Sequence, residues 1–266
     1  MSTDCLPYWH ALTTTDVAAL AARDPVVVLP LAATEQHGPH LPLSTDLDIG
    51  LGLLREAFRQ LPRDLPARVL PTQPIGASRE HLRFAGTLSL DPELLGELIY
   101  QHGSALASSG VRRLVLFNSH GGNLRTMDAA ALRLRGDYGI LVVKASYFAF
   151  SRPDGIALPE SEWHHGLHGG AVETAMMLHL CPTLVHTDAI QRFRSLGQDL
   201  DGPLRRVGPE GEASFAWLAG DLNPHGVTGD ARLADVEIGR RLVTHYGQVL
   251  AEVIQDARAF PLDRLG

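Results

Sequence analysis

The chain has 266 residues, of which 45% are hydrophobic, so it is long enough and apolar enough to form one large domain with a substantial core. Its formal net charge of -7 argues against a general nucleic-acid binder and against a protein held to anionic lipid by charge. Its two cysteines, Cys5 and Cys181, are too few for a disulfide framework or a thiolate metal site.

Targeting signals and membrane segments are missing from the sequence pattern. No apolar run approaches the ~18 residues of a membrane span, and the first residues lack the basic region and apolar core of a signal peptide. We therefore expect a soluble, cytoplasmic protein that binds neither membranes nor nucleic acid. The 13 histidines are a mild excess, and they matter only if they cluster.

In chain order, a short capped helix at residues 14–23 is followed by three consecutive valines that open an apolar run typical of a buried strand. The loop behind that strand holds five potential metal ligands, Glu35, His37, His40, Asp46 and Asp48. Glu35 and His37 are two residues apart, so an extended backbone turns both side chains to the same side. Carboxylates and imidazoles without thiolates suit a hard or borderline divalent cation. The alternative is a polar loop in which Thr45 or Asp46 caps the next helix.

Strands and helices then alternate along the chain. We expect helices at residues 47–61, 91–109, 124–135 and 230–260, and strands at residues 68–70, 111–118 and 140–147. Such alternation predicts a mainly parallel sheet with helices on both faces. The glycine- and proline-rich residues 190–229 have little periodicity. We interpret them as an excursion of a single domain that spans residues 1–266, or as a subunit contact.

Potential ligands follow three of the expected strands. Glu35, His37 and Asp46 come after the first strand, His120 comes after the third, and His168 and Glu173 come after the fourth. Ligands of an open parallel sheet bind outside the carboxyl ends of its strands, so one shared metal centre would account for all three groups. The three carboxylates favour two divalent ions with a bridging hydroxide, because uncompensated buried charge is costly. One ion with a protonated carboxylate is the alternative.

Four stretches, in this order, resemble the creatininase family of metal-dependent amidohydrolases. They are TEQHGPHLPLSTD at 34–46, GASREHLRFAGTLSL at 76–90, NSHGGN at 118–123 and HGGAVET at 168–174. The later stretch GVTGDARLAD is also similar to that family. The resemblance implies a three-layer α/β/α fold, two divalent metal ions (zinc, manganese or iron), hydrolysis of a C–N bond, and a homo-oligomer, often a hexamer.

Carried over position by position, the resemblance implies five metal ligands, namely Glu35, His37, Asp46, His120 and Glu173. Asp46 is shared between the two ions, and Glu173 is a ligand in those members that have a Gly-Gly turn. His168 takes the acid/base role in this comparison. The alternative for His168 is to cap the helix that holds Glu173, or to hydrogen-bond a ligand from behind.

The resemblance also points to residues on the substrate side of the site. These candidates are Ser78, Glu80, His81, Gly121, Gly122 and Trp163. Formation of turns is the alternative role for the residues at 78–81 and for the two glycines. Trp163 lies near His168 in the sequence, at a spacing that differs from that of the family's substrate-stacking tryptophans.

Together these features predict a hydrolase that cleaves a non-peptide C–N bond, in a cyclic amide or a formamide, through a metal-bridged hydroxide, with His168 as proton donor. Gly122 departs from the creatinine-hydrolysing members, which have glutamate there. The NSHGGN form instead resembles relatives that remove a formyl group and the peptidase of the mycofactocin system. A small-peptide metallopeptidase and a non-catalytic metal-binding protein are the alternatives. The loop after the first strand lacks G-x-G-x-x-G, and no P-loop occurs, which argues against a nucleotide-binding domain.

Overall fold

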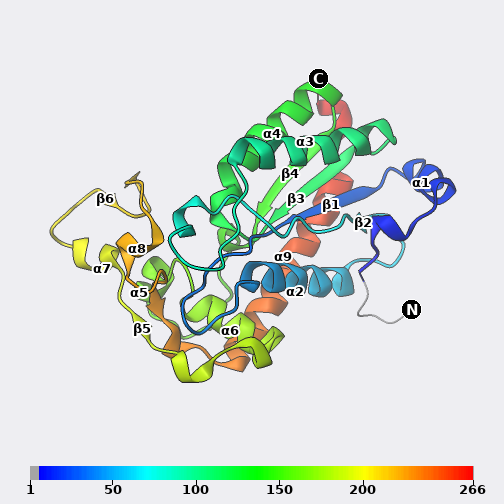
Figure 1. Ribbon diagram of the computed structural model, residues 1–266. Coiled ribbons are helices and arrows are strands. Elements are labelled where there is room, and N and C mark those ends of the chain that lie inside the picture. The colour runs from blue at the N-terminus through cyan, green and yellow to red at the C-terminus, as the bar shows by residue number, and fades with distance from the viewer. Residues whose placement is uncertain (1–5, 266) are drawn as a thin grey trace.

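The computed structural model of the chain describes residues 6–265 and has a four-stranded parallel sheet at its centre (Figure 1). The strands are β1 (Val26–Leu31), β2 (Ala67–Val69), β3 (Arg113–Asn118) and β4 (Leu141–Ser146). Their order in the sheet is β2-β1-β3-β4, with Val26 of β1 opposite Arg113 of β3. Every residue of β1 and β3 is buried, as expected for short apolar strands covered on both faces.

Helices cover both faces of this sheet. The covering helices are α2 (Thr45–Gln60), α3 (Pro92–Ser108), α4 (Leu124–Tyr138), α6 (Ala171–Leu180) and α9 (Val236–Ala259). Val26 and Val28 share an apolar cluster with residues of α2, α6 and α9, whereas Val27 and Leu29 share another with residues of α3 and α4. Figure 1 shows α3 and α4 above the sheet, α2 below it and α9 passing behind the strands. The predicted α/β fold with three layers and a mainly parallel sheet is confirmed.

Side-chain caps account for several helix starts. Before α1 (Thr14–Ala21), the Thr13 hydroxyl accepts a hydrogen bond from the Asp16 N–H at 3.2 Å. The Asp91 carboxylate accepts one from the Glu93 N–H at 2.9 Å and so starts α3 where the sequence predicts it. Gly110 follows the end of α3 with φ at +86°, in the left-handed region that favours glycine.

The last helix is shorter than the sequence predicts. It begins at Val236 instead of residue 230, because the Asp235 carboxylate accepts the Ile238 N–H at 2.7 Å and forms the cap there. The residues ahead of it form β8 (Gly229–Asp230) and a single 3-10 turn. Leu233, which fits the apolar spacing of a longer helix, is exposed on that turn.

Helix α2 begins two residues earlier than expected. Its N-cap position is Ser44, and neither Thr45 nor Asp46 caps it. The alternative in which one of these two residues is only a helix cap is therefore wrong. Asp46 lies in the first turn of α2 and is buried, which leaves its carboxylate free to face other groups.

Residues 190–229 contain only short elements. The strands and α-helices here are β5 (Arg192–Phe193), α7 (Leu196–Leu200), β6 (Val207–Gly208), β7 (Ala213–Ser214) and α8 (Ala219–Leu222), while α5 (Glu160–His165) lies ahead of α6. Strand β5 pairs with β8, and β6 pairs with β7. Figure 1 shows this region at the end of the molecule opposite α1. That it is an excursion of a single domain stays a prediction.

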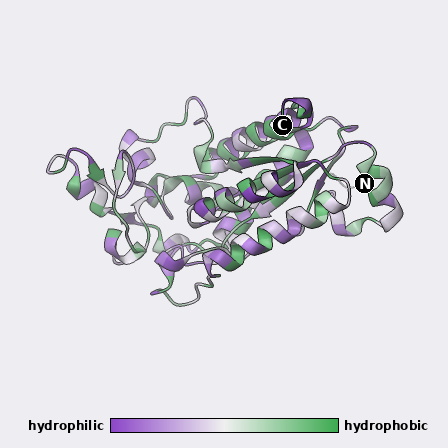
Figure 2. Ribbon diagram, turned by 90° about the horizontal axis from the view of Figure 1, so that it is seen from above, coloured by the Kyte–Doolittle hydropathy of each residue, from purple (hydrophilic) through white to green (hydrophobic). Residues whose placement is uncertain are grey.

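The helices carry hydrophobic and hydrophilic residues side by side, the pattern of helices with one buried face (Figure 2). Across residues 6–265, no helix is long and apolar enough to cross a membrane. Cys181 is a free thiol whose pKa is raised by burial, while Cys5 lies outside the described residues.

Candidate metal centre

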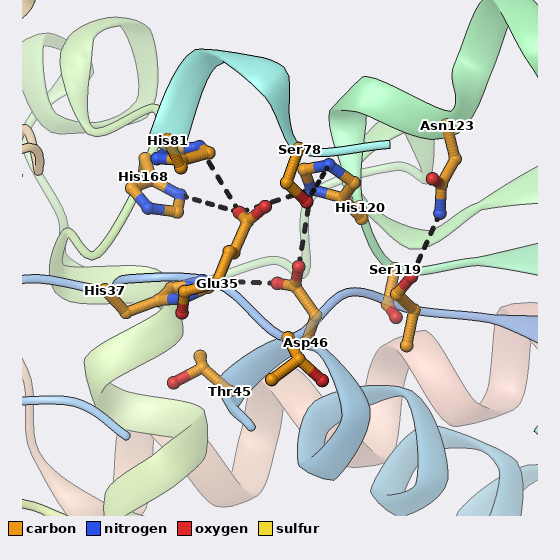
Figure 3. Close-up of polar contacts among 12 residues, drawn as sticks. Glu35, His37, Thr45, Asp46, Ser78, His81, Ser119, His120, Asn123 and His168 are labelled. Carbon is orange, nitrogen blue, oxygen red and sulfur yellow. Dashed lines mark hydrogen bonds and ion pairs between the residues drawn. The ribbon is translucent and has the colours of Figure 1, made fainter. Parts of the chain in front are cut away.

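Side chains from distant parts of the chain converge beyond the carboxyl ends of β1 and β3 (Figure 3). The loop after β1 supplies Glu35 and His37, and the first turn of α2 supplies Asp46. The turn after β3 supplies His120, and the first turn of α6 supplies Glu173. The parallel order of the strands brings these groups to one edge of the sheet.

Two groups of possible ligand atoms share Asp46. In the first group, His120 Nδ1 lies 3.3 Å from Glu35 Oε1 and 3.4 Å from Asp46 Oδ2. In the second, His37 Nε2 lies 3.2 Å from Asp46 Oδ1 and 3.9 Å from Glu173 Oε2. Ligand atoms at about 2.1 Å from one ion lie roughly 3.0 to 3.5 Å from each other, so the spacing within both groups is close to that of a metal site.

Both imidazoles are held from behind by a backbone carbonyl. His37 Nδ1 donates to the Glu35 carbonyl oxygen at 3.1 Å, and His120 Nε2 donates to the Ala77 carbonyl oxygen at 3.1 Å. The opposite nitrogen of each ring faces the carboxylates. That nitrogen must therefore either carry a second proton or bind a cation. A hydrogen bond from the other ring nitrogen to a backbone carbonyl is typical of metal-binding histidines.

Several polar atoms of this cluster have no hydrogen-bond partner although they are buried. Among the described residues these include both carboxylate oxygens of Glu35, Nε2 of His37 and Oδ2 of Asp46. A buried carboxylate without compensation costs several kcal/mol, so the arrangement is incomplete without a cation. Carboxylate and imidazole donors suit zinc, manganese and iron, and these residues therefore fit divalent metal ions.

Two hydrogen bonds position Glu173, the other carboxylate of the second group. The Tyr147 hydroxyl donates to Glu173 Oε1 at 3.0 Å, and the Gly169 N–H donates to Glu173 Oε2 at 2.7 Å. Behind this loop, His40 Nε2 lies 3.1 Å from the Gly169 carbonyl and 3.0 Å from the Thr174 hydroxyl. Such contacts fix the direction of Glu173 before any ion binds.

The pKa values of the histidines and carboxylates in the cluster show that it attracts positive charge. Burial opposes protonation of His37, but the carboxylates of Asp46 and Glu173 outweigh it and raise the pKa of His37 to about 9. Burial likewise opposes protonation of His120, yet the carboxylate charges raise its pKa well above the ordinary value. Burial favours a neutral Glu35, but the neighbouring imidazoles hold its pKa well below the usual range. The neighbouring imidazoles also lower the pKa of Asp46 against the effect of burial, so Glu35 and Asp46 stay ionised and retain a cation, either a proton or a metal.

The metal-free protein should lose stability as the pH rises from about 6.5 to 9. The pKa of His37 is raised from 6.5 to about 9 in the folded protein, so its stabilising contribution is complete below pH 6.5 and is lost as the pH rises through 9. Linkage gives a loss of about 1.4 kcal/mol per pH unit for each extra proton that the folded state holds. His120 acts in the same direction.

Urea unfolding of chelator-treated protein across this pH range measures the effect. Metal-saturated protein is the control, because there the ions replace the protons and binding becomes more favourable at higher pH. Its stability should hold or rise over the same range. A metal-free protein whose free energy of unfolding is constant or increases with pH would contradict this account of the site.

Two further histidines lie against the cluster. His81 Nε2 is 3.4 Å and His168 Nδ1 is 3.8 Å from Glu35 Oε1, and the two rings are 4.4 Å apart. Burial, together with the nearby His168, lowers the pKa of His81 to about 3, and burial lowers the pKa of His168 as well. Both rings are therefore neutral, and both point at the same carboxylate (Figure 3).

Ser78, Glu80 and His81 lie at the cluster, and the last two are on a 3-10 turn. Ser78 is buried, and its hydroxyl lies 3.3 Å from His120 Nε2. Glu80 Oε1 lies 3.7 Å from the same nitrogen, and burial raises the pKa of Glu80. Glu35, Glu80 and His120 also offer ligand atoms close enough for one ion. Glu80 is thus within reach of a metal, a role that the sequence pattern does not suggest.

The two glycines of the turn differ in what surrounds them. A Cβ at Gly122 would lie 2.2 Å from the Ala77 carbonyl and 2.8 Å from Glu80 Oε1, so no side chain fits there without movement. A Cβ at Gly121 would meet nothing within 4 Å. The absence of a side chain at Gly122 thus permits the close approach of Ala77 and Glu80, and the roles of Gly121 and Gly122 toward a metal or substrate stay predictions. The carboxylate of Glu80 occupies the space beside Gly122.

Other candidates have different surroundings. The guanidinium of Arg152 lies 4.9 Å from the ring centroid of Trp163, whose ring packs against the apolar core. His165 Nε2 lies 2.7 Å from Asp201 Oδ2 in the region of short elements. Asp48 Oδ2 accepts a hydrogen bond from the Ser44 hydroxyl at 2.7 Å. The proposal that Trp163 binds substrate stays a prediction.

Sequence reasoning missed Gln36, Asn123 and Tyr147. Gln36 is buried between His81 and His168, and its neighbours Glu35 and His37 in the motif could have drawn attention to it. The Asn123 side chain accepts the Ala77 N–H at 3.0 Å and so holds the segment that carries Ser78. No periodic pattern marks such polar residues, because each acts through a contact with a distant segment.

Comparisons with known proteins agree with this geometry. A sequence model of the creatininase family, described as creatinine amidohydrolase, matches residues 10–254. A mycofactocin precursor peptide peptidase of Mycobacterium ulcerans (strain Agy99) is 32% identical over 257 residues, which cover 94% of this chain and 90% of that protein. A creatinine amidohydrolase of Pseudomonas putida is 32% identical over 188 residues, which cover 65% of this chain and 71% of that protein.

Solved structures give the same result at the level of the fold. A structure titled "Creatininase Mn" superposes with a TM-score of 0.75 at 27% sequence identity and covers 95% of this chain and 98% of its own. Another, a mutant creatininase described as "Zn-Zn type", has a TM-score of 0.73 at 27% identity and covers 95% of this chain and 98% of its own. The match to the family model and the extent of these similarities show that the chain belongs to the creatininase family of amidohydrolases.

Proposed function

We propose that this chain is a two-metal amidohydrolase that cleaves the C–N bond of an amide in a small substrate. The observation that carries the proposal is the buried cluster around Asp46, in which ligand atoms of Glu35, His37 and Asp46 have no hydrogen-bond partner. Three carboxylates, those of Glu35, Asp46 and Glu173, together with one hydroxide would balance the charge of two divalent ions. The two oxygens of Asp46 face different imidazoles, which supports its role as the shared ligand.

The residues that would hold the ions are those that converge at the sheet edge, namely Glu35, His37, Asp46, His120 and Glu173. Divalent ions in such a site polarise the substrate carbonyl and lower the pKa of water. Zinc, manganese and iron all match these donors, and similar structures carry titles that name manganese and zinc.

His168 is the residue that moves the proton. Its Nδ1 faces Glu35 at 3.8 Å, while its Nε2 is held by the Gln36 carbonyl at 2.8 Å. Nδ1 can accept a proton from the attacking water and then deliver it to the leaving nitrogen, because an amine leaves poorly as an anion. Water adds to the carbonyl carbon, the C–N bond breaks, and the products are a carboxylate and an amine.

The site defines the type of reaction more closely than the identity of the substrate. The family resemblance implies a glutamate at the position of Gly122 in creatinine-hydrolysing members, and the glycine here argues against creatinine. A Cβ at Gly122 would lie 2.8 Å from Glu80 Oε1. The relatives named mycofactocin precursor peptide peptidase match up to 94% of the chain, compared with 65% for the creatinine amidohydrolase. A short peptide is therefore the first candidate. A formamide or a cyclic amide, which the sequence alone favours, is the second.

Hydrolysis assays on separately loaded zinc, manganese and iron forms test this proposal. The panel contains short peptides, formamides and creatinine, with product detected by mass. We expect turnover of a peptide or a formamide, loss of that turnover with a chelator, and its return when metal is added. Protein that binds metal fully but hydrolyses no member of the panel would support a metal-binding role without catalysis. Size-exclusion chromatography with light scattering would test the proposed homo-oligomer.

A further inference from the structure

The side chain of Gln36 lies between two imidazoles of the site, and the proposed mechanism gives it no role. Its amide nitrogen is 2.8 Å from His81 Nδ1 and 3.3 Å from His168 Nε2. Gln36 is buried, so each of its polar atoms needs a partner of the right kind. The amide and the backbone carbonyl of Gln36 together determine which nitrogen of each ring carries its hydrogen.

Backbone groups fix the orientation of the Gln36 amide. Its Oε1 accepts the Gly38 N–H at 2.9 Å, and its Nε2 donates to the Gly226 carbonyl at 2.7 Å. Turning the amide over would place a donor against a donor and an acceptor against an acceptor. One hydrogen of Nε2 is therefore committed to Gly226, and one hydrogen remains.

The same residue fixes His168 through its backbone. His168 Nε2 lies 2.8 Å from the Gln36 carbonyl oxygen, which can only accept, so Nε2 carries the hydrogen. In the neutral ring Nδ1 then has a free lone pair. That lone pair is on the side of Glu35, at 3.8 Å from Oε1.

The remaining hydrogen of the Gln36 amide goes to His81. His168 Nε2 already carries a hydrogen and cannot accept another bond, whereas His81 Nδ1 is closer, at 2.8 Å. His81 Nδ1 is thus an acceptor, and its hydrogen is on Nε2. That N–H points toward Glu35 Oε1, at 3.4 Å.

We infer that Gln36 is a positioning residue that gives the two neighbouring imidazoles opposite roles, a hydrogen-bond donor at His81 and an acceptor at His168. The inference rests on the proposed hydrolysis for its significance. Such a reaction needs both groups, because a proton must leave the attacking water while negative charge develops on the carbonyl oxygen. Nδ1 of His168 can accept a proton, and the N–H at Nε2 of His81 can donate a hydrogen bond.

Nitrogen-15 NMR of the wild-type protein, labelled at histidine, tests the assignment without relying on activity. Spectra of the zinc-loaded and metal-free forms distinguish a nitrogen with hydrogen from one without, and single histidine variants assign the signals. We expect both His81 and His168 to carry hydrogen on Nε2. Hydrogen on Nδ1 of either ring would overturn the inference, even if metal binding and hydrolysis are as proposed.

The variant Gln36→Glu then tests the effect on turnover. A carboxylate cannot donate to His81 Nδ1, so the hydrogen of His81 should move to Nδ1, and kcat should fall about 10²- to 10⁴-fold with metal content and KM little changed. Gln73→Glu is the control, because that amide donates to the Ile75 carbonyl at 2.9 Å and not to an imidazole. A folded, metal-loaded Gln36→Glu protein with normal kcat would contradict the inference. Should this variant fail to fold, the wild-type spectra still decide.

Discussion

Replacing Asp46 with alanine should remove both metal ions and abolish hydrolysis. The two oxygens of Asp46 face His37 at 3.2 Å and His120 at 3.4 Å, so the change takes a ligand from each ion and one negative charge from the site. Even changes behind a ligand cost about 10- to 100-fold in metal affinity. Loss of the shared ligand should exceed that range, and metal content per chain and turnover should both fall to background.

Asp48→Ala is the matched control for this experiment. Asp48 lies in the same first turn of α2 and has the same charge, but its carboxylate accepts a hydrogen bond from the Ser44 hydroxyl. The control should keep metal and activity. Asp46→Ala protein that folds and retains the metal content of the wild type would contradict the assignment of Asp46 as a ligand.

Replacing His168 with alanine should affect hydrolysis alone. The variant should retain its metal and lose its turnover. Nδ1 of His168 lies 3.8 Å from Glu35, and His168 is not one of the five proposed ligands around Asp46. Loss of the group that we propose transfers the proton should reduce kcat about 10²- to 10⁴-fold. Metal content from elemental analysis and kcat from the best substrate of the panel measure the two effects on the same samples.

His186→Ala is the control, because this histidine is exposed and belongs to none of the possible ligand groups among the described residues. It should change neither metal content nor kcat. Loss of metal in His168→Ala would contradict the proposed role, because Glu35, His37 and His168 also offer ligand atoms within reach of one ion. In that case His168 would be a ligand and the proton would need another carrier.

The sequence predicts the location of this site because the strands are parallel. Glu35 and His120 each follow a strand, and the carboxyl ends of parallel strands meet at one edge. The boundaries of α3 could also be predicted from the sequence, because Asp91, Pro92 and Gly110 are strong local signals of a helix start and end. Such features depend on residues close together in the chain, or on a topology that the alternation of elements dictates.

Other features depend on contacts between distant segments, which a single sequence does not reveal. The Gln36 amide bonds the Gly226 carbonyl 190 residues away, and that contact orients the amide against His81. Gly122 and Glu80 share one space, although neither residue alone indicates the other. The predicted start of α9 was wrong for a local reason. The apolar spacing continues into the residues before Asp235, but the Asp235 side chain caps the helix and so fixes its start at Val236.

The number of divalent metal ions bound per chain tests the central claim most directly. Elemental analysis of protein purified without added metal, and again after loading and removal of free ions, gives this number. The account predicts close to two ions per chain, because the carboxylates of Glu35, Asp46 and Glu173 face two imidazoles in two groups that share Asp46. Protein that holds no metal and takes up none on loading would contradict it, and protons on His37 and His120 would then balance the buried carboxylates.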